Sequence, residues 1–250
     1  MYNKKIIIFA IIGIISILAL SACSLKKSID KDSDKTGIAA NQPDTEEEKI
    51  KRDNADTVKN ARNGAVKKVR AVDDADHVRG DKNAPVQIII YSDFECPYCA
   101  KFTRTIEQAA EEFKEKVAVV YRHFPLTFHK RATLAAIASE CASGQGKFWE
   151  MHDKIFADNV VGRLSADQLK KDAADLGLDA TEFNQCLATE KYKEKVEAQT
   201  VEGKSAGIIG TPTSFVNGEI VIGAYPMDDF TDSAGVERKG LRSIIQRYLK

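Results

Sequence analysis

The stretch Ser92-Asp93-Phe94-Glu95-Cys96-Pro97-Tyr98-Cys99 joins the apolar run Val86–Tyr91 to a segment with helical spacing, and it decides the fold. The run before it is apolar and β-branched apart from Gln87, which is typical of a strand buried on both faces. Pro97 suits the first turn of a helix, where its missing N–H would have no partner. The sequence therefore predicts a strand that passes into a helix at two cysteines spaced C-x-x-C.

The C-x-x-C spacing predicts redox chemistry. Two thiols at this spacing can close a small disulfide ring, and the first sulfur lies near the helix N-terminus. Free N–H groups and the helix dipole favour a thiolate there. An ordinary thiol, with a pKa of about 8.5, is mostly protonated at neutral pH. A lower pKa would therefore supply the thiolate that disulfide exchange consumes.

Zinc binding is the alternative for such a pair of cysteines. Tetrahedral zinc takes four ligands, and the sequence has no second C-x-x-C. His123 and His129 form an H-x5-H pair, but Pro125 lies between them and a strand precedes them. We therefore predict no metal site. Capping or packing roles are expected for the four histidines, His77, His123, His129 and His152.

Further elements follow from periodicity. Apolar residues recur at helical spacing over 97–116, and 117–121 has the pattern of a second buried strand. The two strands are therefore expected to pair in parallel through a right-handed βαβ unit. Helices are then predicted at 130–143, at 147–156, after the caps Ser165 and Asp179, and at 192–205.

The C-terminal part returns to β structure. Strands are predicted at 213–216 and 219–222 around Asn217-Gly218, the strongest short-range signal for a hairpin. A last helix is predicted at about 236–248. The order βαβ, helical block, ββα predicts an α/β fold with a thioredoxin-like sheet and a helical insertion at about 129–206.

The domain is expected to span residues 71–250. The chain before it has the composition of an export signal and a linker. Residues 1–22 combine a positive start with an apolar stretch that is short for a membrane span. The small residues before Cys23 resemble a bacterial lipobox, so we expect cleavage there and a lipid on Cys23. An uncleaved anchor helix over 6–22 is the alternative. Residues 23–70 are polar, as expected of a tether, and part of them has a helical pattern.

Charge and cysteine count narrow the class of protein. Lys+Arg and Asp+Glu both total 37, and this near-neutral balance gives no reason to expect a nucleic acid partner. Apart from Cys23, four cysteines remain, an even number that suits an oxidising compartment. If Cys96 pairs with Cys99, Cys141 is left to pair with Cys186. Two buried free thiols are the alternative for that second pair.

Three motifs together resemble the DsbA-like thiol-disulfide oxidoreductase family. They are Ser92 to Cys99, Gly210-Thr211-Pro212-Thr213 and Phe215-Val216-Asn217-Gly218. They occur in order behind an export signal, and the likeness covers about residues 75–250. It includes the helical insertion, where Gln145-Gly146-Lys147-Phe148-Trp149 is also similar to that family. The resemblance implies a thioredoxin-like fold and a dithiol that exchanges disulfides with other proteins.

The resemblance also implies roles for single residues. Cys96 would be the attacking thiolate, and Cys99 would resolve the mixed disulfide or re-form the ring. Pro212 would be the family's cis-proline and would face the disulfide. The Thr211 backbone would then pair with an extended substrate segment as a short added strand. An ordinary proline at a strand entry is the alternative for Pro212.

Three neighbours of the cysteines are expected to modulate them. Pro97 and Tyr98 form the central dipeptide, which adjusts thiolate stability in this fold, and Tyr98 is a candidate for touching substrate. Pro-Tyr also resembles the glutaredoxin dipeptide, which leaves the strength of the oxidant open. Glu95 would raise the pKa of Cys96 if charged and close, or relay protons to Cys99 if buried. A side chain that faces solvent is the alternative for Glu95.

Together these features predict a membrane-tethered thiol-disulfide oxidoreductase outside the cytoplasm, on a periplasmic face or a cell surface. It would form disulfides in unfolded or folding exported proteins that contain cysteine. The Cys96–Cys99 disulfide carries the electrons, so no dissociable cofactor is expected, and a membrane redox partner would reoxidise it. An extracytoplasmic reductase or isomerase is one alternative. A non-catalytic lipoprotein scaffold with two structural disulfides is the other.

Overall fold

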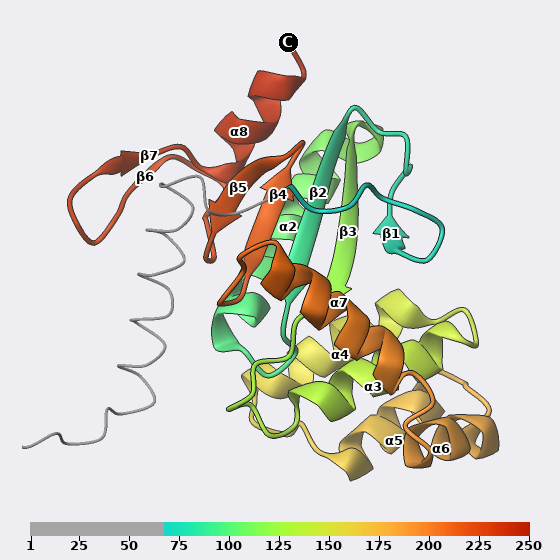
Figure 1. The fold of residues 1–250 in the computed structure, drawn as a ribbon. Coiled ribbons are helices and arrows are strands. Elements are labelled where there is room, and N and C mark those ends of the chain that lie inside the picture. Colours follow the sequence, from blue (N-terminus) through green and yellow to red (C-terminus); the bar gives the residue numbers. More distant parts are fainter. Residues whose placement is uncertain (1–67) are drawn as a thin grey trace, which may run out of the picture. The chain divides into compact units, whose positions relative to one another are not determined.

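The computed structural model describes residues 68–250, which are built around a five-stranded sheet of order β1-β3-β2-β4-β5. The strands are β1 His77–Arg79, β2 Val86–Ser92, β3 Val117–His123, β4 Thr213–Val216 and β5 Glu219–Ile222. β2 and β3 run parallel, whereas the other neighbouring pairs run antiparallel. Figure 1 shows β2 between β3 and β4. The predicted parallel βαβ unit and the predicted β4–β5 hairpin are both confirmed.

The crossover from β2 to β3 is the helix α2, Pro97–Phe113. Its buried apolar residues recur at three- and four-residue spacing, as the sequence predicts: Phe102, Ile106 and Ala109. The helix ends earlier than the predicted residue 116. Lys114 takes a φ of +46°, and a short 3₁₀ turn, η1 (Lys114–Lys116), leads into β3. The difference is confined to the end of the helix. The predicted helical crossover between β2 and β3 is confirmed.

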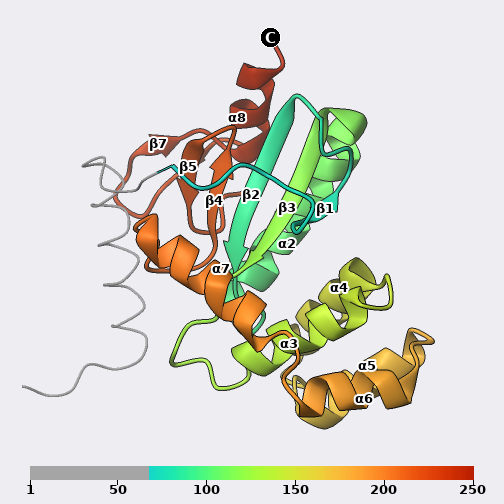
Figure 2. The ribbon, with the colours of Figure 1, turned by 45° about the vertical axis from the view of Figure 1, so that its right-hand side comes forward.

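Alternation along β2 divides its side chains between two apolar cores. Ile90 faces the core that contains α2 and the C-terminal helix α8, Leu241–Tyr248. Ile89 and Tyr91 belong to the core on the opposite face, which is covered by α7, Lys193–Ser205. Figures 1 and 2 show α2 and α8 on one side of the sheet and α7 on the other. Burial on both faces explains why β2 reads as a continuous apolar run.

Four more helices stand between β3 and α7 and form, with α7, the helical insertion. They are α3 (Ala132–Ser143), α4 (Phe148–Val160), α5 (Ala166–Asp175) and α6 (Ala180–Ala188). Figures 1 and 2 show them gathered beyond the carboxyl ends of β2 and β3. Both predicted caps are confirmed. Ser165 Oγ accepts the Gln168 N–H at 3.2 Å, and Asp179 Oδ1 accepts the Glu182 N–H at 2.8 Å.

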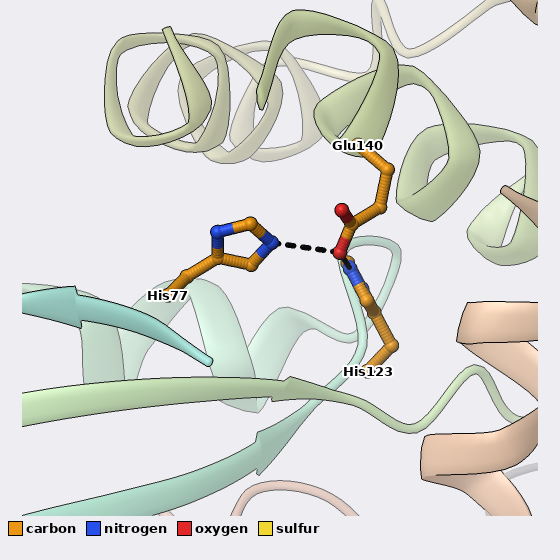
Figure 3. A group of neighbouring side chains, drawn as sticks. All are labelled: His77, His123 and Glu140. Carbon is orange, nitrogen blue, oxygen red and sulfur yellow. Dashed lines mark hydrogen bonds and ion pairs between the residues drawn. The ribbon is translucent and has the colours of Figure 1, made fainter. Parts of the chain in front are cut away.

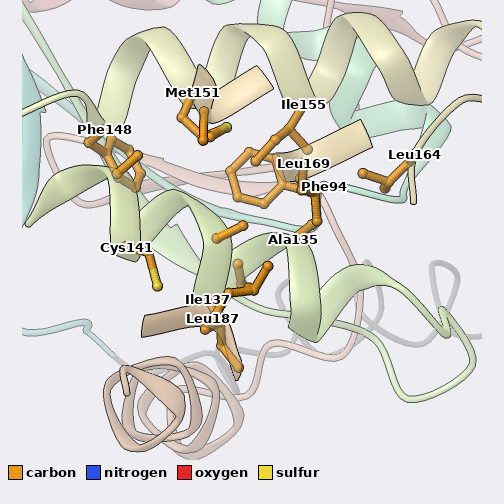
Figure 4. Close-up of a cluster of buried hydrophobic side chains, with 14 of the residues drawn as sticks. Phe94, Ala135, Ile137, Cys141, Phe148, Met151, Ile155, Leu164, Leu169 and Leu187 are labelled. Carbon is orange, nitrogen blue, oxygen red and sulfur yellow. The ribbon is translucent and has the colours of Figure 1, made fainter. Parts of the chain in front are cut away.

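The insertion has its own apolar core, and that core extends to the strand–helix junction of the sheet. Phe94, which follows β2, is buried among residues of α3, α4 and α5 such as Ala135, Ile155 and Leu169 (Figure 4). Cys141 of α3 and Cys186 of α6 form a disulfide, with a sequence separation of 45. Chain-entropy arithmetic assigns about 4 kcal/mol to a loop of this length. The bond joins α3 to α6, the first and last of these four helices.

A buried arginine ties the chain before β1 to the sheet. The Arg122 side chain in β3 is fully buried, and its Nη2 lies 2.9 Å from Asp76 Oδ2. Its Nη1 lies 2.9 Å from Glu202 Oε1 in α7. A buried guanidinium without partners would be costly, so the two carboxylates are needed to offset its charge. β1, which follows Asp76, was not predicted because three half-buried residues give too short a pattern.

The predicted last helix, 236–248, begins too early. α8 starts at Leu241, after a short hairpin of β6 (Phe230–Thr231) and β7 (Glu237–Arg238). Between these strands Asp232 Oδ1 accepts the backbone N–H of Val236 at 3.0 Å. Aspartate side chains that bond nearby backbone groups favour turns over helices, which explains the difference.

The predictions for residues 1–22 and for Cys23, and nearly all of the tether at 23–70, lie outside the described residues. Within 68–250, none of the helices has the length and apolar character that crossing a membrane requires.

We expect Gly203→Ala to destabilise the protein by about 1–3 kcal/mol, the usual cost of overpacking a core. Gly203 lies in α7 where the helix approaches the sheet. An added Cβ would be 2.7 Å from Phe124 Cδ2 and 3.0 Å from Tyr91 Cδ1. Urea unfolding measures the effect. Lys204→Ala, at the exposed next position, is the control and should change stability by less than about 0.5 kcal/mol. Equal stability of the two variants would contradict this close packing.

Candidate active site

Cys96 and Cys99 lie at the N-terminus of α2, directly beyond the carboxyl end of β2. Cys96 is the N-cap residue in an extended conformation, Pro97 takes the first helical position, and Cys99 follows within the first turn. Both cysteines are free thiols and both are buried, with exposed fractions of 4% and 1%. Tyr98 between them is 49% exposed. The central dipeptide therefore faces solvent, while the two sulfurs are covered.

The two thiols differ in acidity because their surroundings differ. The hydrogen bond from the Cys99 thiol, together with a weaker one from the Cys99 backbone, lowers the pKa of Cys96 to about 7 although burial raises it. Complete burial, reinforced by the neighbouring Cys96 sulfur, raises the pKa of Cys99 well above its ordinary value. At neutral pH Cys96 is therefore partly ionised. Cys99 keeps its proton.

The segment before β4 lies against Cys96. β2 and β4 pair so that Tyr91 is opposite Thr213, which brings the preceding residues to the cysteines. Cys96 Sγ donates to the Thr211 carbonyl oxygen at 3.5 Å. The Thr211–Pro212 peptide bond is cis. Thr211 thus lies beside Cys96, with Pro212 next along the chain.

Glu95 contacts the connection between β3 and α3 (residues 124–131). Its Oε2 accepts the backbone N–H of Arg131 at 2.6 Å, and its Oε1 lies 3.8 Å from Arg131 Nε. The side chain is 17% exposed, so it does not simply face solvent. Among the described residues the Glu95 side chain contacts Arg131, which holds this connection close to the cysteines.

Asp93 and His129 are site residues that the sequence analysis missed. The Asp93 N–H donates to Cys99 Sγ at 3.5 Å, and its fully buried carboxylate lies 2.8 Å from His129 Nδ1. His129 does not cap α3, whose N-cap is Arg131. Burial lowers the pKa of His129, but the hydrogen bond with Asp93 and the nearby negative charges together outweigh burial and raise that pKa above its ordinary value. An aspartate just before the cysteines was an available signal. Its partner, 36 residues later, gave none.

A small cavity of about 20 Å³ reaches Cys99. Ser92, Glu107, Tyr121 and His152 are among its lining residues. The space suits one water and is far too small for an organic cofactor. Within residues 68–250 the buried Tyr121 hydroxyl has no hydrogen-bond partner, so it is available to such a water. Burial raises the pKa of Tyr121 and lowers that of His152, which keeps both side chains neutral.

A second cluster, formed by His77, His123 and Glu140, has donor atoms that could hold a metal ion (Figure 3). His77 Nε2 and His123 Nε2 lie 2.7 and 2.9 Å from the same oxygen, Glu140 Oε1. Lys195 of α7 is also present, with Nζ 2.7 Å from Glu140 Oε2 and 3.2 Å from His77 Nε2. Its ammonium supplies the positive charge that a cation would bring. We therefore read the cluster as an ion-pair network that joins β1, β3, α3 and α7, and assign no metal to it.

Comparison with known proteins agrees with this architecture. A family model described as thioredoxin matches residues 72–233. Na(+)/H(+) antiporter NhaA 1 of Salinispora arenicola is 40% identical over 157 residues, which are 62% of this chain and 24% of the antiporter. The chain thus spans about a quarter of the length of the curated relatives it matches.

Two solved structures have a similar fold. BdbD from Bacillus subtilis, in its oxidised form, gives a TM-score of 0.59 at 22% identity, covering 74% of this chain and 98% of BdbD. The thiol-disulfide exchange protein alpha-DsbA2 from Wolbachia pipientis gives a TM-score of 0.55 at 18% identity, covering 70% of this chain and 91% of that protein. The match over 72–233 and the sheet with its helical insertion lead to one conclusion: this chain belongs to the thioredoxin family and has the DsbA-like form of its fold.

Proposed function

We propose that this protein is a thiol-disulfide oxidoreductase that forms disulfides in exported proteins through Cys96 and Cys99. The observation that carries the proposal is the unequal acidity of the two thiols. Cys96, at a helix N-terminus, has a pKa lowered to about 7, whereas Cys99 is fully buried with a raised pKa. One reactive and one protected sulfur suit a two-step exchange. The Wolbachia protein of similar fold is itself described as a thiol-disulfide exchange protein.

The proposed reaction starts from the Cys96–Cys99 disulfide. A substrate thiolate attacks Cys96 Sγ, the ring opens, and Cys99 leaves and takes up a proton. A second substrate thiolate then attacks the substrate sulfur of the mixed disulfide. Cys96 leaves as a thiolate, which its lowered pKa favours. The substrate loses two electrons and gains a disulfide, and the protein becomes the dithiol.

We propose that substrate chains bind at Thr211 and Tyr98. Thr211 lies within hydrogen-bond distance of Cys96, so an extended segment that pairs with its backbone would bring a substrate cysteine to Cys96 Sγ. Pro212 has no N–H that would compete for that segment. Tyr98 adds an exposed aromatic surface next to Cys96.

The remaining parts of the proposal concern location and partners. Residues 1–22 are proposed to be an export signal, and Cys23 is proposed to carry the lipid that tethers the protein to the membrane. The reduced dithiol must pass its two electrons on before the next cycle. We propose a quinone-linked membrane protein as that oxidant. The Cys141–Cys186 disulfide is proposed to be structural and not to turn over.

We expect Cys96 in the reduced protein to be alkylated with a pH midpoint of about 7, well below the value of about 8.5 for an ordinary thiol. In Cys99→Ala the midpoint should rise, because the thiol that donates to Cys96 is gone. Rates of iodoacetamide reaction at a series of pH values, with the modified residue identified by mass spectrometry, measure both. A midpoint near that of free cysteine in the unaltered protein would contradict an activated thiol.

Cys99→Ala is also expected to trap substrates in cells, because the mixed disulfide on Cys96 can no longer be resolved from within the site. Non-reducing gels should show covalent adducts that disappear with dithiothreitol. The double variant Cys96→Ala/Cys99→Ala is the control and should give none. If adducts are absent from both variants under oxidising conditions, the scaffold alternative is favoured.

The direction of electron flow is tested by equilibrium with glutathione. As an oxidase, the Cys96–Cys99 couple should have a reduction potential more positive than about −200 mV, toward the value of about −120 mV for DsbA. Quantifying reduced and oxidised protein at several glutathione ratios gives this potential. A value near −270 mV, that of thioredoxin, would overturn the oxidase assignment and favour a reductase.

A further inference from the structure

Asp93 connects the dithiol to a histidine on a separate segment of the chain. Its backbone N–H donates to Cys99 Sγ at 3.5 Å. Its Oδ2 accepts the Leu126 N–H at 2.7 Å and lies 2.8 Å from His129 Nδ1, while its Oδ1 accepts the Glu95 N–H at 2.7 Å. The carboxylate is fully buried, and the His129 side chain is 12% exposed. The His129 side chain therefore reaches the surface, whereas the Asp93 carboxylate does not.

The buried Asp93 carboxylate opposes ionisation of both thiols. Like charges close together in a site of low polarity disfavour each other. Consistently, Asp93 raises the pKa of both Cys96 and Cys99, although it is not the largest cause for either. A positive charge on His129 would offset the carboxylate and remove part of this penalty. The charge on His129 therefore affects the ionisation of Cys96, and it does so through the hydrogen bond to Asp93.

The other charged groups near His129 are of two kinds. Some favour the protonated imidazole, and the others are exposed cations. Cys96 and Glu95, from the junction with α2, both favour the charged imidazole. Lys130 and Arg131 follow His129 in the chain and are exposed. The Arg131 side chain is directed to Glu95 and to the Leu164 carbonyl. Of these cations, His129 is the one whose contact with Asp93 is direct.

We propose, on the basis of the function proposed above, that His129 acts through Asp93 as a positioning residue that takes up a proton when the Cys96–Cys99 disulfide is reduced. A substrate dithiol brings two protons and two electrons. The two electrons break the Cys96–Cys99 bond, one proton goes to Cys99, and the other is held by His129 while Cys96 remains a thiolate. The substrate leaves with its new disulfide. Reduction thus adds one negative and one positive charge to the site, and its net charge is unchanged.

Coupling between two sites is reciprocal. If the Cys96 thiolate favours the charged imidazole, the charged imidazole must favour the thiolate by the same factor. Histidine is suited to this role because its ordinary pKa, about 6.5, lies near neutral pH. The same position filled by lysine or arginine would hold a fixed charge and would take up no proton on reduction.

The direct test follows the His129 ring by NMR during pH titration of the unaltered protein in its two redox states. We expect the midpoint of His129 to be higher in the dithiol form than in the disulfide form, by up to about one unit. Identical midpoints in the two states would overturn the proposal. This measurement uses no variant and does not depend on how a substitution folds.

His129→Gln provides the second test, because glutamine keeps an N–H donor for Asp93 but cannot be charged. Alkylation of Cys96 at about pH 6.5 should become about 3- to 10-fold slower, with an unchanged limiting rate at high pH, as expected for a raised thiol pKa. The dithiol should become less favourable by the same factor in equilibrium with glutathione. Lys130→Gln is the matched control, since it removes a charge from an exposed position in the same connection, and both readouts should be unchanged.

The outcomes separate this proposal from the function on which it rests. If Cys96 titrates as an ordinary thiol in the unaltered protein, the proposed oxidoreductase fails and the role of His129 fails with it. If Cys96 titrates near pH 7 and His129→Gln leaves that midpoint in place, the role of His129 alone is overturned.

Discussion

The antiparallel pairing of β2 with β4 is the constraint on which the site depends. β2 ends where Cys96 opens α2, and β4 begins just after the Thr211–Pro212 bond. The register that sets Tyr91 opposite Thr213 therefore brings the Thr211 carbonyl to Cys96, from 115 residues away in the sequence. A slip of one residue would turn every side chain of β4 to the other face and withdraw that carbonyl. The helical insertion fills the long connection between these segments without altering their pairing.

The insertion also contributes to the chemistry of the cysteines. Cys96 and Cys99 lie within one turn of α2, yet their acidities are shifted in opposite directions. Both belong to the apolar core formed largely by α3, α4, α5 and α6, which shields Cys99 from bulk solvent. Burial keeps the Cys99 proton in place, and that proton is the hydrogen-bond donor that most lowers the pKa of Cys96. The activation of the first sulfur thus follows from the burial of the second.

Elements coded by local signals could be predicted, and contacts between distant residues could not. The crossover from β2 to β3 follows from apolar periodicity, the hairpin from Asn217-Gly218, and the starts of α5 and α6 from their caps. The start of α8 was misplaced because Asp232 binds the turn before it. The pair Asp93 and His129, and the cluster around Glu140, join segments whose proximity exists in the fold alone. The chemistry of the two cysteines was therefore predictable, but its electrostatic surroundings were not.

Buried charges recur in this fold, and the charges described here have partners on other elements. Arg122 is paired with two carboxylates, Glu140 with Lys195, and Asp93 with His129. Because an uncompensated buried charge costs several kcal/mol, each of these charges needs its partner. The pair Arg122–Glu202 also joins β3 to α7. The Cys96 thiolate differs from them, since its charge exists in one redox state and is absent in the other. A permanently charged cation would balance the thiolate in the reduced state. In the oxidised state it would leave a positive charge without a counterpart. A partner that gains and loses its own charge near neutral pH suits both, and this is the physical reason for a histidine at position 129.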